Sequence, residues 1–108
     1  MKAKELRIGN LVDVLGDPVF ISYHDLIKLS KGIKTSMQPI PLTESWLLKF
    51  GFDEDGGYYG SYMLWFEKPF THAFLNADIL GEIKFPCKYV HQLQNLYFAL
   101  TGEELTIK

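Results

Sequence analysis

One long amphipathic segment near the end of the chain limits the folds open to this sequence. Between Lys88 and Thr101, apolar residues recur at three- and four-residue intervals, the spacing of one face of an α-helix. Gly102 follows, and glycine readily takes the left-handed conformation that ends a helix. The sequence predicts a C-terminal helix over residues 88–101 that packs across a sheet through Tyr89, Val90, Leu93, Leu96, Tyr97 and Leu100.

The other apolar residues fall in short runs that are typical of strands. A turn signal at Gly9-Asn10 precedes the alternating run 11–14, and Gly16-Asp17-Pro18 separates this run from residues 19–23, so we expect a hairpin. Residues 58–66, 70–75 and 79–85 predict a three-stranded meander. Residues 24–29 are too few for periodicity to decide between strand and helix, and we favour a strand. Residues 105–107 are expected to add an edge strand.

A second, shorter helix is predicted just before the middle of the chain. Residues 30–41, with their glycine and prolines, predict a surface connection. Thr43 is suited to capping the free amides of a helix start, and Leu42 can contact Leu47 across the first turn. Gly51 then supplies the stop.

Length and composition place these elements in one fold class. A chain of 108 residues with 47% apolar side chains has the size and the apolar content of one domain, spanning residues 1–108. We therefore expect an α+β domain: a mainly antiparallel sheet, made of the N-terminal hairpin and the central meander, packed with one short helix and one longer C-terminal helix. Whether the sheet is open or closes into a barrel is left undecided by the sequence.

Charge and cysteine content limit the binding partners and the cellular location that the sequence predicts. The net charge of −2 provides no global attraction to nucleic acid or to an anionic membrane. The single Cys87 cannot form an internal disulfide, and no apolar run approaches the length of a membrane span. The sequence therefore predicts a cytoplasmic protein with no membrane partner.

The sequence lacks a recognisable metal-binding or catalytic constellation. The residues His24, His72, Cys87 and His91 are scattered, whereas a zinc site needs ligands at short, characteristic spacings, so no metal or other cofactor is expected. The acidic run 53–57 lacks the glycine and glutamate of a calcium loop and is read as a plain turn. An enzyme that uses Cys87 or His91 is the third hypothesis, because Pro86 favours placing Cys87 at the first turn of the helix, with His91 four residues on.

The aromatic content is the main functional lead. Eight Phe, six Tyr and two Trp are many for this length, and aromatic side chains are enriched in protein interfaces. The leading hypothesis is therefore a non-catalytic protein-binding or assembly module, which binds a protein partner or a second copy of itself as a homodimer. An alternative for the polar residues of the last helix is that they face water or pair with a neighbouring loop. The candidate binding residues are Tyr58, Tyr59, Tyr62, Trp65, His91, Gln94, Asn95 and Phe98.

The second hypothesis is a domain that binds single-stranded nucleic acid. An aromatic sheet can stack on unpaired bases, and a short basic run can follow the phosphates. Lys28, Lys31 and Lys34 supply such a run.

Two strings connect the chain with a known group of proteins. PIPLTE at residues 39–44, followed by Trp46-Leu47-Leu48, and VHQLQNLYFALTGEEL at residues 90–105 span much of the sequence. With Gly9-Asn10 near the start, they resemble a group of small uncharacterised proteins of bacterial genomes and their phages or prophages. The resemblance implies a setting in mobile elements and supplies no activity and no catalytic residues.

Overall fold

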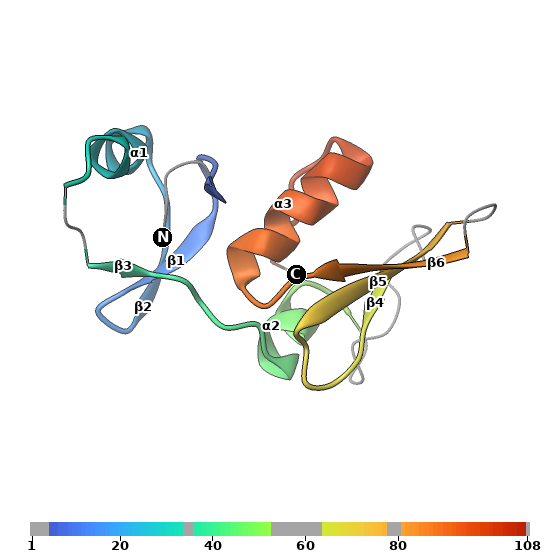
Figure 1. Cartoon of the computed structure of the whole chain (residues 1–108). Helices are drawn as coiled ribbons and strands as arrows, with labels where there is room; N and C mark the ends of the chain where they lie inside the picture. Colours follow the sequence, from blue (N-terminus) through green and yellow to red (C-terminus); the bar gives the residue numbers. More distant parts are fainter. Residues whose placement is uncertain (1–4, 34–35, 53–63, 78–80, 108) are drawn as a thin grey trace. The chain divides into compact units, whose positions relative to one another are not determined.

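A computed structural model describes residues 5–33, 36–52, 64–77 and 81–107, and here the chain forms two compact units (Figure 1). The first unit comprises Met1–Pro41 and Tyr89–Glu104, and the second comprises Leu42–Lys88 and Leu105–Lys108. Within the described residues each unit contains a three-stranded antiparallel sheet. The predicted α+β class is therefore confirmed, whereas the assignment of all 108 residues to one domain stays a prediction.

The sheet of the first unit begins with the expected hairpin. Strands β1 (Leu11–Val14) and β2 (Asp17–Phe20) pair antiparallel, and Leu15 and Gly16 connect them. The φ angles of Leu15 and Gly16 are both positive, 53° and 95°, which is the signature of the type I′ turn that matches the twist of a two-residue hairpin. The hairpin prediction is confirmed, although β2 starts at Asp17 and not at Val19.

A third strand completes this sheet from the segment that the sequence assigns to a surface connection. Strand β3 (Met37–Gln38) pairs antiparallel with β1, opposite Asp13 and Val14. The prediction of an irregular connection over residues 30–41 is thus wrong for this part. Met37 is buried in the core of the unit, and this burial holds the short strand against β1.

Pro18 lies on the outer edge of the sheet. The Ile21 N–H donates to the Asn10 carbonyl at 2.8 Å, and hydrogen-bonded pairs alternate along an antiparallel ladder. The backbone hydrogen-bonding groups of Pro18 and Phe20 therefore point away from β1. Because proline has no N–H, only Phe20 offers an outward donor on β2.

Helix α1 (Tyr23–Ser30) replaces the strand that the sequence favoured for residues 24–29, so this prediction is wrong. The reason is a capping box. The Ser22 hydroxyl accepts from the Asp25 N–H at 3.3 Å, and the Asp25 carboxylate accepts from the Ser22 N–H at 2.9 Å. Leu26 and Leu29 of α1 then pack on a core formed by Leu6, Val12, Ile21 and Met37.

Helix α3 (Val90–Thr101) confirms the predicted C-terminal helix and starts two residues later than expected. The Tyr89 N–H donates to the Gln92 side chain at 3.2 Å. Gly102 has φ 75°, and its N–H donates to the Phe98 carbonyl at 2.8 Å. A glycine in the left-handed conformation commonly ends an α-helix in this way. The apolar stripe is buried at Val90, Leu93 and Tyr97 and half-buried at Leu96 and Leu100.

The second unit contains the meander. Strands β4 (Leu64–Phe66), β5 (His72–Ala77) and β6 (Gly81–Pro86) pair antiparallel in sequence order, which confirms the predicted meander. Residues 58–63 of its first predicted strand and residues 79–80 of its third lie outside the described residues. Helix α2 (Glu44–Lys49) also forms as expected, with Thr43 as its N-cap and Gly51 in the left-handed conformation. Residues 105–107 form no strand, which corrects that prediction; Leu105 is held by side-chain burial instead. The buried apolar residues of this unit include Leu42, Leu47, Phe50, Phe52, Leu64, Phe66, Phe70, Ala73, Cys87 and Leu105.

Among the described residues, no helix combines the length and the apolar character that crossing a bilayer requires.

Candidate functional site

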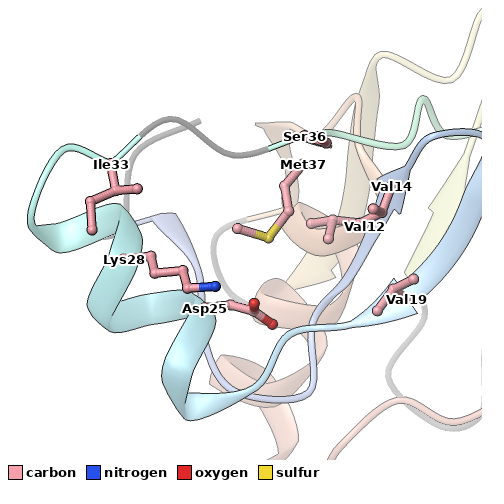
Figure 2. A pocket seen from close by; sticks show the side chains of 8 residues that line it. All are labelled: Val12, Val14, Val19, Asp25, Lys28, Ile33, Ser36 and Met37. Carbon is pink, nitrogen blue, oxygen red and sulfur yellow. The ribbon is translucent and has the colours of Figure 1, made fainter.

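A pocket opens between α1 and the sheet of the first unit (Figure 2). Val12, Val14 and Val19 occupy one face of the β1–β2 hairpin, because Val12 and Val19 are cross-strand partners and Val14 is two residues further along β1. Met37 of β3 and Ile33 beyond α1 complete an apolar wall. The cavity has a volume of about 390 Å³, which lies in the range of small-molecule sites.

The polar side of this pocket comes from α1 and from Ser36, the residue before β3. Asp25, Lys28 and Ser36 line it, and Figure 2 shows the Asp25 and Lys28 side chains directed from the helix toward the space in front of Met37. Hydrogen bonds from the Ser22 N–H and hydroxyl lower the pKa of Asp25, so its carboxylate is charged and already engaged in the cap. Lys28 forms no hydrogen bond and no ion pair with any described residue.

Lys28 and Lys31 lie at exposed positions on and just after α1, and Lys34 lies outside the described residues. The basic run is therefore placed in the first unit. The aromatic strands proposed to stack on bases belong to the second unit. Tyr58, Tyr59 and Tyr62, and the acidic run 53–57, also lie outside the described residues.

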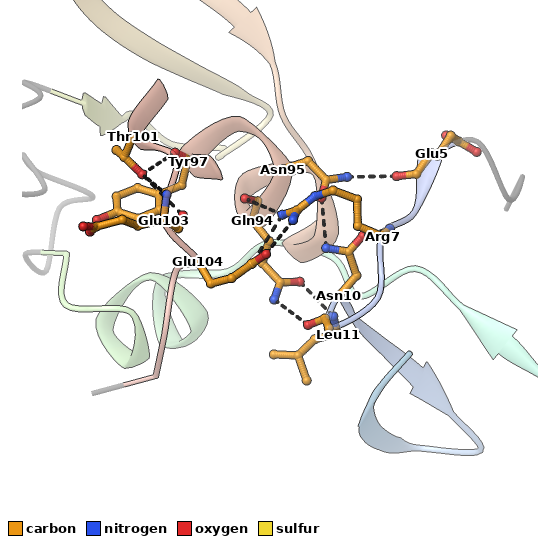
Figure 3. A network of polar contacts seen from close by, with 11 residues as sticks. Glu5, Arg7, Asn10, Leu11, Gln94, Asn95, Tyr97, Thr101, Glu103 and Glu104 are labelled. Carbon is orange, nitrogen blue, oxygen red and sulfur yellow. Dashed lines mark hydrogen bonds and ion pairs between the residues drawn. The ribbon is translucent and has the colours of Figure 1, made fainter. Parts of the chain in front are cut away.

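Gln94 connects α3 to the start of β1 and is almost fully buried, with 2% of its surface exposed. Its side-chain oxygen accepts from the Leu11 N–H at 2.8 Å, and its side-chain nitrogen donates to the Gly9 carbonyl at 3.2 Å (Figure 3). Both ends of the amide are thus used to satisfy backbone groups beside β1. The expectation that Gln94 belongs to an exposed binding face is wrong.

Asn95 connects α3 to the segment that precedes β1. Its side-chain oxygen accepts from Arg7 Nε at 2.8 Å and from Asn10 Nδ2 at 2.9 Å, and its nitrogen donates to the Glu5 carbonyl at 2.9 Å (Figure 3). Arg7 also forms an ion pair with Glu104. The alternative in which the polar residues of the last helix pair with a neighbouring loop is therefore confirmed for Gln94 and Asn95.

Of the four predicted binding residues on α3, only Phe98 is exposed, at 40%. The Arg7 guanidinium lies 4.3 Å from the centre of its ring, in cation–π geometry. The ring is thus partly covered by the same arginine that binds Asn95. The polar set on α3 supports the first unit, and no open binding face is formed by its four members together.

His91 is a buried imidazole at the start of α3. It is 1% exposed, and neither Nδ1 nor Nε2 contacts a partner among the described residues. Its ring stacks on Tyr89, with centroids 5.8 Å apart and an interplanar angle of 7°. Burial lowers the pKa of His91 below its ordinary value of 6.5, although the charge of Glu5 opposes this shift.

This lowered pKa predicts an acid-sensitive fold. Between pH 6.5 and the lower pKa of the folded state, the unfolded chain binds a proton that the folded chain does not. The free energy of unfolding should therefore fall as the pH drops through this window, by up to about 1.4 kcal/mol per pH unit. His91→Leu should flatten the pH dependence between pH 7.5 and 5 in urea titrations, whereas the exposed-site control His24→Gln should retain it. An unchanged slope in His91→Leu would contradict the prediction.

Cys87 is not arranged for catalysis. The thiol is buried, and desolvation raises its pKa to about 12, so the reactive thiolate is disfavoured. Helix α3 begins only at Val90, and Tyr89 is its N-cap, so Cys87 gains nothing from the helix start. Cys87 belongs to the second unit and His91 to the first. No cluster of three or more His, Cys, Asp or Glu side chains arranged to hold a metal ion occurs in the part of the chain that the structure describes.

Trp65 is the remaining member of the predicted aromatic set. It is half-buried and stacks on its cross-strand partner Phe74, with ring centroids 5.6 Å apart and an interplanar angle of 15°. Phe74 is in turn paired with Lys84 of β6, whose amino group lies 6.0 Å from the ring centre. Sequence reasoning identified Trp65 but not this row, because the row depends on the register of three strands.

Comparison with known proteins supplies no relative for these features. No family model, no curated protein sequence and no solved structure matches the chain.

Proposed function

We propose that this protein is a non-catalytic protein-binding or assembly module. We propose further that it is an accessory protein of a phage or prophage, because its two sequence strings resemble a group of proteins from such elements. One observation carries the proposal: five of the nine large apolar side chains that are exposed among the described residues belong to the segment 8–23. Large contiguous apolar surface on a soluble domain marks interaction sites more often than scattered single residues do. Among the described residues, Ile8, Leu15, Val19, Phe20 and Tyr23 all fall within residues 8–23 and are exposed.

Leu15 supports this interpretation most directly. It occupies the first turn position of the hairpin with φ 53°, where glycine or asparagine is preferred, and 86% of its surface is exposed. Local backbone preference and solvation both disfavour leucine there. A binding role for the side chain accounts for a leucine that is this exposed at a turn position.

We define the hairpin surface as Leu15, Phe20 and Tyr23. Phe20 lies on the opposite face of β2 from Val19, so this surface is separate from the pocket wall. The bound partner contacts these three side chains and is a folded protein or a second copy of this chain.

The test is a binding selection with the full chain. A displayed peptide and protein library is selected against the wild type, and the selected binders are then measured against Leu15→Asn/Phe20→Thr. Asparagine suits the type I′ turn and threonine suits a strand, so this variant should fold normally. We expect binding to fall at least about tenfold, as for the loss of central interface residues.

A matched control removes an exposed leucine from the other unit. Leu48 on α2 is exposed, and Leu48→Gln should leave binding unchanged. Sedimentation over a concentration series distinguishes self-association from binding of another protein. Binders that ignore both hairpin substitutions, together with a monomer at all concentrations, would overturn the proposal.

A second candidate function rests on the row Trp65, Phe74 and Lys84. Aromatic side chains beside a lysine on the face of an antiparallel sheet are a recurrent feature of single-strand nucleic-acid binding. Salt dependence separates the two functions, because phosphate binding weakens steeply as salt rises while apolar contact does not. Oligonucleotide binding that is lost in Lys84→Gln and at high salt would favour this candidate.

A further inference from the structure

The pocket of the first unit has a wall that is apolar over most of its area. Val12 is fully buried, Met37 is nearly so, and Val14 is half-buried, so the wall is a continuation of the core cluster of the unit. Val19 and Ile33 are exposed and lie at the mouth. A cavity of about 390 Å³ in such a wall holds a short aliphatic or branched chain.

The two charged groups that line the pocket differ in how much of their hydrogen-bonding capacity is already used. The pocket is lined by one carboxylate and one ammonium group. The carboxylate of Asp25 accepts hydrogen bonds from the Ser22 N–H and hydroxyl, both at 2.9 Å. The ammonium group of Lys28 forms no hydrogen bond or ion pair with the residues that the structure describes, and its three donors are available. Ser36 adds a hydroxyl to the same lining.

Lys31 adds a second positive charge at the C-terminal end of α1. It is exposed directly after α1, one helical turn beyond Lys28. Asp25 keeps its negative charge, but Lys28 and Lys31 outnumber it on α1 and its C-cap, and the unused donors of Lys28 favour an anionic group. A ligand with an apolar chain and a single anionic group matches both the wall and the free donor.

We propose that this pocket binds a small aliphatic carboxylate, with the hydrocarbon chain against Val12, Val14, Val19 and Met37 and the carboxylate on Lys28. The site goes beyond the protein-binding function, because it uses the face of the hairpin opposite to Phe20. A free carboxylic acid and the C-terminal residue of a peptide share this chemistry. The two sources are separated by comparing hexanoate with N-acetyl-leucine.

The experiment is an NMR titration of the full chain with three probes that share one chain and differ in charge: hexanoate, hexan-1-ol and hexylammonium. Shifts should appear at the lining residues, including Val14 and Met37. We expect hexanoate to bind about threefold more tightly than hexan-1-ol, the preference that one partly exposed charge pair provides, and hexylammonium to bind most weakly. N-acetyl-leucine binding more tightly than hexanoate would assign the site to a peptide terminus, and the reverse to a free acid.

Paired variants isolate each contribution. Lys28→Gln should abolish the preference for hexanoate over hexan-1-ol, whereas Lys31→Gln, which does not line the pocket, should retain most of it. Val19→Trp should fill the mouth and weaken all three probes at least about tenfold, while Phe20→Trp on the opposite face should not. Thermal melts verify that each variant is folded.

Two results would overturn the proposal. Tighter binding of hexylammonium than of hexanoate would assign the recognition to Asp25 and reverse the predicted charge of the ligand. Absence of shifts at the lining residues with every probe would remove the pocket as a ligand site. Neither result bears on the hairpin surface, whose own test uses Leu15 and Phe20.

Discussion

Gln94→Leu should lower the free energy of unfolding by about 2–3 kcal/mol, because it leaves two backbone groups beside β1 without partners. In the native protein the Gln94 amide bonds the Leu11 N–H and the Gly9 carbonyl. Leucine has a similar volume and retains the burial, so the expected loss reports the unmade hydrogen bonds. Urea unfolding followed by circular dichroism at pH 7.5 measures the change.

The same exchange at an exposed site provides the control. Gln38 of β3 is exposed, and Gln38→Leu should change stability by less than about 0.5 kcal/mol. Gln94→Glu is expected to be at least as destabilising as Gln94→Leu, since it buries a carboxylate with one oxygen facing the Gly9 carbonyl. If Gln94→Leu were as stable as the wild type, the bonds between α3 and the β1 segment would contribute nothing to stability.

Phe66→Ala should destabilise the protein by about 3–5 kcal/mol, the cost of removing a large buried ring and leaving a cavity. Phe66 is 1% exposed at the end of β4, and its ring contacts Phe52 edge to face with centroids 5.6 Å apart. The loss of apolar burial and the loss of the aromatic pair both act in the same direction. The midpoint of urea unfolding should fall with little change in slope.

Phe20→Ala serves as the matched substitution at a solvent-exposed ring. Phe20 is 62% exposed on the edge strand, so its removal should cost less than about 0.5 kcal/mol. Similar losses in the free energy of unfolding for Phe66→Ala and Phe20→Ala would contradict the burial of Phe66 in the core of the second unit.

The elements with strong local signals could be predicted from the sequence. Helix α3 has twelve residues, a continuous apolar stripe and Gly102 at its end, so periodicity and end chemistry agree. Helix α1 has only eight residues, and over this length periodicity cannot separate a helix from a strand. The available signal was Ser22 followed three residues later by Asp25, a capping box with aspartate in place of the usual glutamate.

The candidate site was much less predictable than the fold. Its wall combines three valines of the hairpin with Met37. The sequence does show that Val12 and Val14, two residues apart on one strand, point to the same face. Asp25 and Lys28 join them only because α1 is a helix, so the incorrect strand assignment concealed the pocket. The roles of Gln94 and Asn95 depend on contacts with residues more than eighty positions away, which no local pattern encodes.

The proline at the edge of the first sheet also restricts how this protein can associate. An edge strand with exposed apolar side chains is ordinarily at risk of recruiting further strands and of seeding fibrils. Pro18 interrupts the row of donors on β2, so an incoming strand would find one available amide where a regular edge offers two. The proposed assembly through this hairpin would therefore rely on side-chain packing, and it should not extend by the addition of strands to β2.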